Sequence, residues 1–357
     1  MYNPTFLSDE ELKDFILKIK MSYKKMKRDS KPEKCLLCGE THTSFCESHT
    51  IPQFILKNIA NNGYVYRILP SDEIIPESGV KNRIGIGETN VFYDICNSCD
   101  GSYFQDYENE DKLSSFSSLQ EREKQRIMTL IALKNALRDI YQDLGNIDYV
   151  NYLEKEVNKI NKKQQLIMKP HVEVEEQDYK DHVELRDLFF DALKTNKDLF
   201  HVCYYKKIHH TVPLAIQATL VPHTDFNGQT INDVYDMGAY FKYLFICIFP
   251  LKESSIILVY CFERDWAATF KDYFKQFSTF KDPIKSKMLL GLSLAHTDQI
   301  YLNEFAFDRL KQNSSAKVLA RFNTTTDEET FGNLTLQFSR EVDIKECYGL
   351  PDLLNNK

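Results

Sequence analysis

The stretch Cys35-Leu36-Leu37-Cys38 and its counterpart Cys96-Asn97-Ser98-Cys99 decide the fold of the N-terminal third of this chain. The chain has 9 cysteines among 357 residues, so chance would supply only about 0.2 pairs with this CxxC spacing. A CxxC turn places two thiolates side by side, and two such turns complete the tetrahedral S4 site that structural Zn²⁺ prefers. The alternative, buried or redox-active cysteines, lacks the βαβ context of a thioredoxin-like motif. The two pairs therefore predict one structural zinc ion held by Cys35, Cys38, Cys96 and Cys99.

The residues between and after the two pairs predict a short sequence of elements. Residues 44–49 have the pattern of a strand that ends in His49, and residues 90–95 predict a second strand that leads into the second cysteine pair. Residues 100–113 contain no proline and can form a helix. The expected order is strand, histidine, excursion, strand and helix.

This order, with its cysteine pairs, resembles the HNH group of ββα-metal (His-Me finger) endonucleases, in the variety whose fold is stapled by zinc. The resemblance covers about residues 33 to 112 and is carried by the two CxxC pairs, by Ser48-His49-Thr50-Ile51-Pro52, and by Asp100 directly after the last cysteine. The serine-histidine-x-Ile-Pro variety is found in bacterial anti-phage defence proteins. The resemblance therefore implies a phosphodiester hydrolase, with a role in antiviral defence as the biological setting.

The resemblance also implies roles for individual residues. His49 would be the general base that activates water, and Asn90 is the nearest match to the asparagine that orients this histidine. Asp100 would bind a catalytic Mg²⁺ or Mn²⁺ ion, with Glu108, two helical turns farther on, as a second acidic ligand. Histidine suits the role of base because its unperturbed pKa of about 6.5 leaves it largely neutral near pH 7, and hard carboxylate oxygens suit Mg²⁺.

One departure from the family pattern leaves an alternative open. The more usual pattern has an acidic residue or a histidine directly before the base, and this chain has Ser48. A serine hydroxyl is a poor replacement for a metal-binding carboxylate. The alternative is a catalytically inactive zinc-binding module that binds nucleic acid or protein, in which His49 supports the fold and Glu108 is an ordinary surface acid.

The composition is that of a globular protein, and charge is distributed unevenly. Hydrophobic residues make up 43% and charged residues 27% of the chain, which excludes a largely disordered, collagen-like or coiled-coil protein. The formal net charge is −7, but the segment from Lys13 to Lys34 has nine basic and three acidic residues, a local charge of +6. A nucleic-acid contact would therefore be local. We expect a nucleic-acid substrate, DNA rather than RNA.

The remainder of the chain predicts a larger α+β region. A serine-rich joint near residues 114–118 divides the chain into residues 1–116, a basic helix plus the zinc-stabilised HNH-like unit, and residues 117–357, a sensor or regulatory α+β domain. Helical spacing follows the joint, with further helices near 151–163 and 178–193. Strands are expected over 200–205, 214–221, 241–249 and 256–262, with helices near 266–277 and 283–294. Because the strands are grouped, a mostly antiparallel sheet is expected.

The expected location is the cytoplasm. Residues 1–11 are polar and acidic and lack the apolar core of a secretory signal. The apolar run at residues 241–249 is far shorter than the roughly 20 residues that a membrane-spanning helix needs, so we expect no membrane partner. A partner protein or a second copy of the chain is expected to bind through the C-terminal region.

Overall fold

The computed structural model describes residues 32–67, 82–89, 91–160, 165–233, 236, 238–321, 342 and 344–355. Nearly all of the basic segment 13–34, where the basic helix is expected, and Asn90 lie outside these residues. Among the described residues, no helix is long and apolar enough to cross a membrane.

The main sheet has seven strands in the order β3-β2-β9-β6-β7-β8-β5. Each neighbouring pair is antiparallel, which confirms an α+β fold with a mostly antiparallel sheet. The strands are β2 (Tyr64–Arg67), β3 (Arg83–Gly85), β5 (Phe200–Ile208), β6 (Leu214–Leu220), β7 (Leu244–Pro250), β8 (Ser255–Phe262) and β9 (Ile300–Leu302).

Strands β7 and β8 are adjacent interior strands of this sheet, and every residue in both strands is buried. Successive side chains of β7 alternate between two hydrophobic cores: Phe245 packs in one and Ile246 in the other. A strand that is covered on both faces has no solvent side, so its sequence is an apolar run rather than an alternating one. The two strands form a hairpin, since Pro250 pairs with Ser255 at its closed end.

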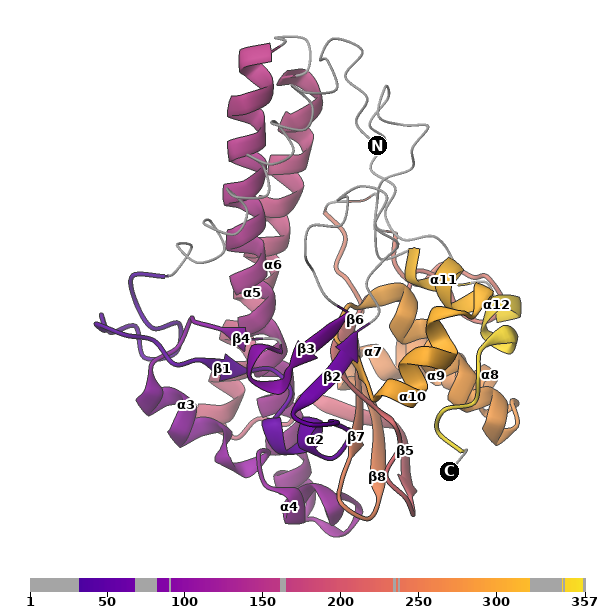
Figure 1. The fold of residues 1–357 in the computed structure, drawn as a ribbon. Helices are drawn as coiled ribbons and strands as arrows, with labels where there is room; N and C mark the ends of the chain where they lie inside the picture. The colour runs from indigo at the N-terminus through magenta and orange to yellow at the C-terminus, as the bar shows by residue number, and fades with distance from the viewer. Residues whose placement is uncertain are drawn as a thin grey trace.

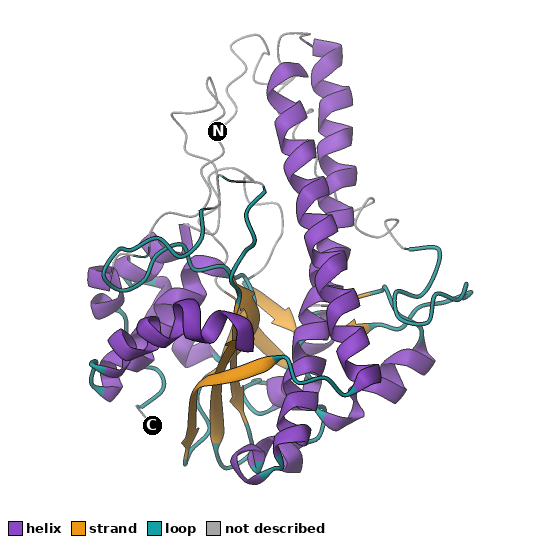
Figure 2. Ribbon diagram, turned by 180° about the vertical axis from the view of Figure 1, so that it is seen from behind, coloured by secondary structure: helices purple, strands orange, loops and turns teal. Residues whose placement is uncertain are grey.

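Helices cover both faces of the sheet (Figure 1, Figure 2). On one face lies a hairpin of two long helices, α5 (Glu121–Ile160) and α6 (Gln165–Thr195), which extends well beyond the sheet. The sequence predicted only segments of these helices. On the other face lie α8 (Lys271–Ser278), α9 (Asp282–His296), α10 (Glu304–Lys311), α11 (Ser314–Arg321) and α12 (Ile344–Gly349). A short helix, α7 (Glu263–Asp265), and a π-helical turn at Trp266–Phe270 lead into α8.

A small ββα unit precedes the long helices. Strand β1 (Ser48–His49) pairs antiparallel with β4 (Val91–Phe92), and α3 (Asn97–Tyr103) follows. Between the two strands lie α2 (Gln53–Lys57) and a 3-10 helix at Ile86–Glu88, and after α3 comes α4 (Glu110–Ser114). The element order matches the order expected from the sequence.

The ββα unit and the larger region share one sheet and one core. Strand β2, from the excursion between β1 and β4, pairs with β9 through Tyr66 and Leu302. Phe104, near the end of the ββα unit, belongs to the same hydrophobic core as Leu133 of α5 and Phe245 of β7. The serine-rich joint at residue 116 therefore marks a change in composition within a continuous core, and the division into two domains stays a prediction.

Candidate functional site

The four cysteines of the two CxxC pairs form one cluster. Their Sγ atoms all lie within 4.8 Å of one another, and Cys38 is the one exposed member. Four ligands at Zn–S distances of about 2.3 Å around a tetrahedral ion would be separated by about 3.8 Å, so the cluster is of the right size for one zinc ion. This outcome agrees with the predicted zinc-binding residues.

Backbone geometry brings the two cysteine pairs together. Gly39 turns the chain after the first pair with φ +74°, a region that favours glycine, and its N–H donates to the Cys35 carbonyl at 2.9 Å. The N–H of Leu36 donates to the carbonyl of Asp94 at 2.9 Å, which ties the first knuckle to the second. The N–H of Cys96 donates to Cys35 Sγ at 3.4 Å.

Hydrogen bonds to its Sγ atom favour the thiolate of Cys35. Burial raises its pKa, but the backbone N–H groups of Cys38, Cys96 and Leu37 lower it more in total, to about 7. Because a metal ion binds the thiolate rather than the thiol, this environment suits a metal ligand.

Ser48 joins the end of strand β1 to helix α3. Its side chain is 1% exposed, and its hydroxyl donates to Asp100 Oδ1 at 2.6 Å. Cys46 Sγ lies 3.5 Å from the other oxygen of the same carboxylate. Burial, and next the negative charge of Asp100, raise the pKa of Cys46 to about 12, so this thiol stays protonated and can donate to Asp100.

His49 occupies the end of β1 and faces the excursion. Its Nε2 lies 3.3 Å from the carbonyl oxygen of Gly87 and 3.1 Å from Nε2 of Gln53. The Gly87 carbonyl can only accept a hydrogen bond and the Gln53 amide nitrogen can only donate one, so Nε2 satisfies one of these two contacts in each tautomer. Burial is the main cause that lowers the pKa of His49, and the positive charge of Lys134 adds to this effect. The imidazole is therefore neutral at pH 7, as a general base must be.

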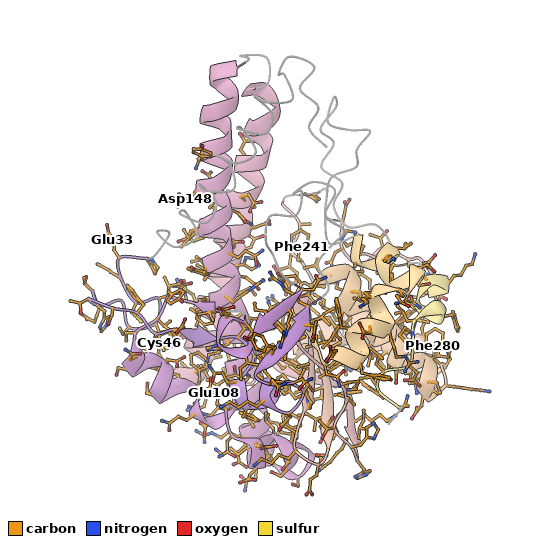
Figure 3. The ribbon with its side chains drawn as sticks, in the orientation of Figure 1. Glu33, Cys46, Glu108, Asp148, Phe241 and Phe280 are labelled. Carbon is orange, nitrogen blue, oxygen red and sulfur yellow. The ribbon has the colours of Figure 1, made fainter. Side chains whose placement is uncertain are left out.

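Asp100 and Glu108 lie together around a buried lysine. Lys134 of helix α5 is 1% exposed, and its Nζ lies 2.5 Å from Glu108 Oε1 and 3.3 Å from Asp100 Oδ1. The side chain of Asp100 is 22% exposed and that of Glu108 is 34% exposed. Figure 3 labels Cys46 and Glu108, which lie in this part of the molecule.

This arrangement does not fit a Mg²⁺ or Mn²⁺ ion between the two carboxylates. Such an ion needs oxygen ligands at about 2.1 Å, and the position between Asp100 Oδ1 and Glu108 Oε1 is taken by an ammonium group. The four cysteines therefore fit the zinc ion that the sequence predicts. Asp100 and Glu108, in contrast, are already paired with the ammonium group of Lys134.

The structure thus brings most of the predicted site residues to one region, but His49 and Asp100 contact different residues there. Asp100 contacts Ser48, which precedes His49, whereas the imidazole itself contacts Gly87 and Gln53. Asn90 lies outside the described residues.

Sequence reasoning missed Lys134, although the sequence contains a signal for it. Lys134 and Asn135 interrupt the apolar run from Leu130 to Leu137, and both are buried. Because lysine is almost never fully buried unless it is paired, a lysine within a core-facing helix predicts a carboxylate partner elsewhere in the chain.

In comparisons with protein-family models, with curated proteins and with solved structures, no match to this chain was found. The assignment of a function therefore rests on the residues described above and on their chemistry.

Proposed function

We propose that this protein is a nuclease that hydrolyses phosphodiester bonds, with His49 as the general base on a zinc-stapled ββα scaffold. The observation that carries the proposal is the position of His49. It ends β1, the first strand after the first cysteine pair, on a unit in which strand β1, strand β4 and helix α3 follow one another in the order that the resemblance implies.

The proposed chemistry assigns the proton transfer to the His49 ring. Hydrolysis needs a water molecule that loses a proton as it attacks phosphorus, and the neutral imidazole of His49 would accept this proton on a ring nitrogen. The lowered pKa of His49 keeps the ring in the accepting form. The zinc ion would hold the scaffold together without taking part in the reaction.

Phosphodiester hydrolysis also needs positive charge near the reacting phosphate. The resemblance implies Mg²⁺ or Mn²⁺ for this task, and that ion stays a prediction. Because the two expected carboxylate ligands already hold an ammonium, an ion between them is not part of the proposed mechanism. Anti-phage defence, and DNA rather than RNA as substrate, are likewise proposals from the resemblance.

The test is cleavage of plasmid, single-stranded DNA and RNA by the zinc-loaded protein, with and without added Mg²⁺ or Mn²⁺. We expect His49→Ala to lower the rate by about 10²-fold or more. His209→Ala is the matched control because His209 is exposed and follows strand β5. Failure of the wild type to cut any substrate, or equal cutting by His49→Ala, would overturn the proposal.

A second candidate function is favoured by one observation. Ser48 donates a hydrogen bond to Asp100, and Lys134 balances the charge of Asp100 without a metal ion, as expected for a ββα unit that has become a zinc-stabilised binding module. This candidate predicts that the protein binds nucleic acid or a partner protein and that it cuts no substrate under any of the conditions above.

A further inference from the structure

The carboxylate of Asp100 is surrounded by hydrogen donors. The Ser48 hydroxyl lies 2.6 Å from Oδ1, the Lys134 ammonium lies 3.3 Å from the same oxygen, and the Cys46 thiol lies 3.5 Å from Oδ2. A carboxylate has about four acceptor positions, so three donors use most of its capacity. None of the three donors adds negative charge to the site.

Lys134 is built into this position from a different part of the chain. Helix α5 supplies it, and its ammonium lies over the ring of Phe104, 4.5 Å from the centroid, and 5.8 Å from that of Tyr107. Both rings are buried. A cation over aromatic faces is stabilised by the ring quadrupoles, so the lysine has a complete environment of carboxylates and rings.

Two features of the sequence make the charge around Asp100 and Glu108 less negative. The position before His49 carries a neutral serine, and Lys134 adds one positive charge between Asp100 and Glu108. Each feature reduces the negative charge that would attract a divalent cation, and the ammonium also repels one. The two features together replace the electrostatic role of a metal ion with groups of the chain itself.

We propose that Lys134 takes the place of a divalent cation between Asp100 and Glu108, so that the pair does not bind Mg²⁺ or Mn²⁺ in this protein. The inference rests on the ββα site of the proposed function. It follows that any hydrolysis by this site does not need a divalent ion at these two carboxylates.

The experiment measures Mn²⁺ binding by the full-length, zinc-loaded protein in buffer freed of other divalent ions, with electron paramagnetic resonance detection of free Mn²⁺. The variants are Lys134→Gln, Lys134→Gln with Glu108→Gln, and Glu108→Gln alone. Lys124→Gln is the matched control because Lys124 is also on α5 but pairs only loosely, 3.8 Å from Glu121. Zinc content and circular dichroism report whether each variant is folded.

We expect the wild type and Lys124→Gln to show no Mn²⁺ binding that depends on Glu108. We expect Lys134→Gln to gain about one Mn²⁺ per chain, with affinity at least about tenfold above the wild type, and the double variant to lose it. A wild-type Mn²⁺ site that Glu108→Gln abolishes would overturn the inference, as would a folded Lys134→Gln that gains no site. The wild-type measurement is decisive even if Lys134→Gln does not fold.

The outcome is separable from that of the proposed function. Absence of cleavage on every substrate would overturn the nuclease assignment and would leave the Mn²⁺ result unchanged. Cleavage that requires Mg²⁺, together with loss of a wild-type Mn²⁺ site in Glu108→Gln, would keep the nuclease and overturn the replacement by Lys134.

Discussion

Replacing Lys134 with methionine removes the ammonium and keeps most of the apolar stem. In the wild type, this ammonium is 1% exposed and lies 2.5 Å from Glu108 and 3.3 Å from Asp100. Removing one partner of a fully buried ion pair typically costs about 3–5 kcal/mol, because the remaining charge is left without compensation. Since the two carboxylates keep part of their exposure to water, we expect a loss of about 3 kcal/mol in the free energy of unfolding.

A second substitution shows whether this loss comes from unpaired charge. Adding Glu108→Gln to Lys134→Met removes one of the uncompensated carboxylates, so we expect about 1–2 kcal/mol to be recovered. The control is Lys124→Met on the same helix, where the pair with Glu121 is long and Glu121 is 64% exposed. Exposed pairs of this kind contribute little, so the control is expected to change stability by less than about 0.5 kcal/mol.

The assay is equilibrium unfolding in urea with zinc-saturated protein, because bound zinc itself adds to the stability of the folded state. The comparison is valid where the slope against urea concentration is the same for all variants. The reasoning is refuted if Lys134→Met has wild-type stability, or if Glu108→Gln destabilises the Lys134→Met protein further.

Three other predictions concern the cysteines and two histidines. Cys38→Ser should lower the zinc content from about one ion per chain to nearly none and should destabilise the ββα unit. A purified Cys38→Ser protein that keeps its full zinc content would contradict the four-cysteine site. Because burial lowers the pKa of His49, the rate of hydrolysis should stay constant down to a pH below 6.5 and fall only as the imidazole is protonated; a midpoint above 6.5 in the pH–rate profile would argue against His49 as the base. Burial lowers the pKa of His182, but the hydrogen bond with Asp143 at 2.6 Å and the negative charges of Asp143, Asp139 and Asp178 together raise it to about 9. The stabilising contribution of His182 is therefore fully present below pH 6.5 and is lost as the pH rises through about 9. His182→Gln should thus unfold at lower urea concentration than the wild type at pH 6, with the difference shrinking toward pH 10, and a pH-independent difference would contradict this account.

The parts of the fold that were predictable are those whose signal lies within a short segment. The apolar run from Leu244 to Phe249 predicted a strand because burial on both faces leaves no room for polar residues. The full length of α5 was not predictable, because its sequence beyond residue 150 is mostly polar and shows no clear apolar stripe. Strands β2 and β3 were missed because they are short: β3 pairs with β2, and β2 pairs on its other side with β9, far away in the sequence.

The site shows the same division between local and distant signals. The cysteine spacing predicted the cluster because each CxxC is a local turn, whereas the role of His49, proposed from the motif around it, stays a prediction. Nothing near Asp100 or Glu108 in the sequence shows that a lysine 26 residues beyond Glu108 would pair with both of them. A carboxylate that looks like a metal ligand in a motif can therefore have its charge balanced by a residue that the motif does not contain.

Two successive residues of α5 explain why the small unit and the large sheet form one structure. Lys134 pairs with the carboxylates of the ββα unit, and Asn135 accepts a hydrogen bond from Gln217 of β6 at 2.9 Å and donates one to Thr219 at 3.3 Å. Both side chains are buried, and a buried polar group without its partner costs far more than the pair gains. The rotation of helix α5 about its axis and its position along that axis are therefore fixed by polar contacts with the ββα unit and with strand β6. The same contacts that place it against the sheet place the ammonium between Asp100 and Glu108, so the charge of the candidate site is set by the packing of the larger region.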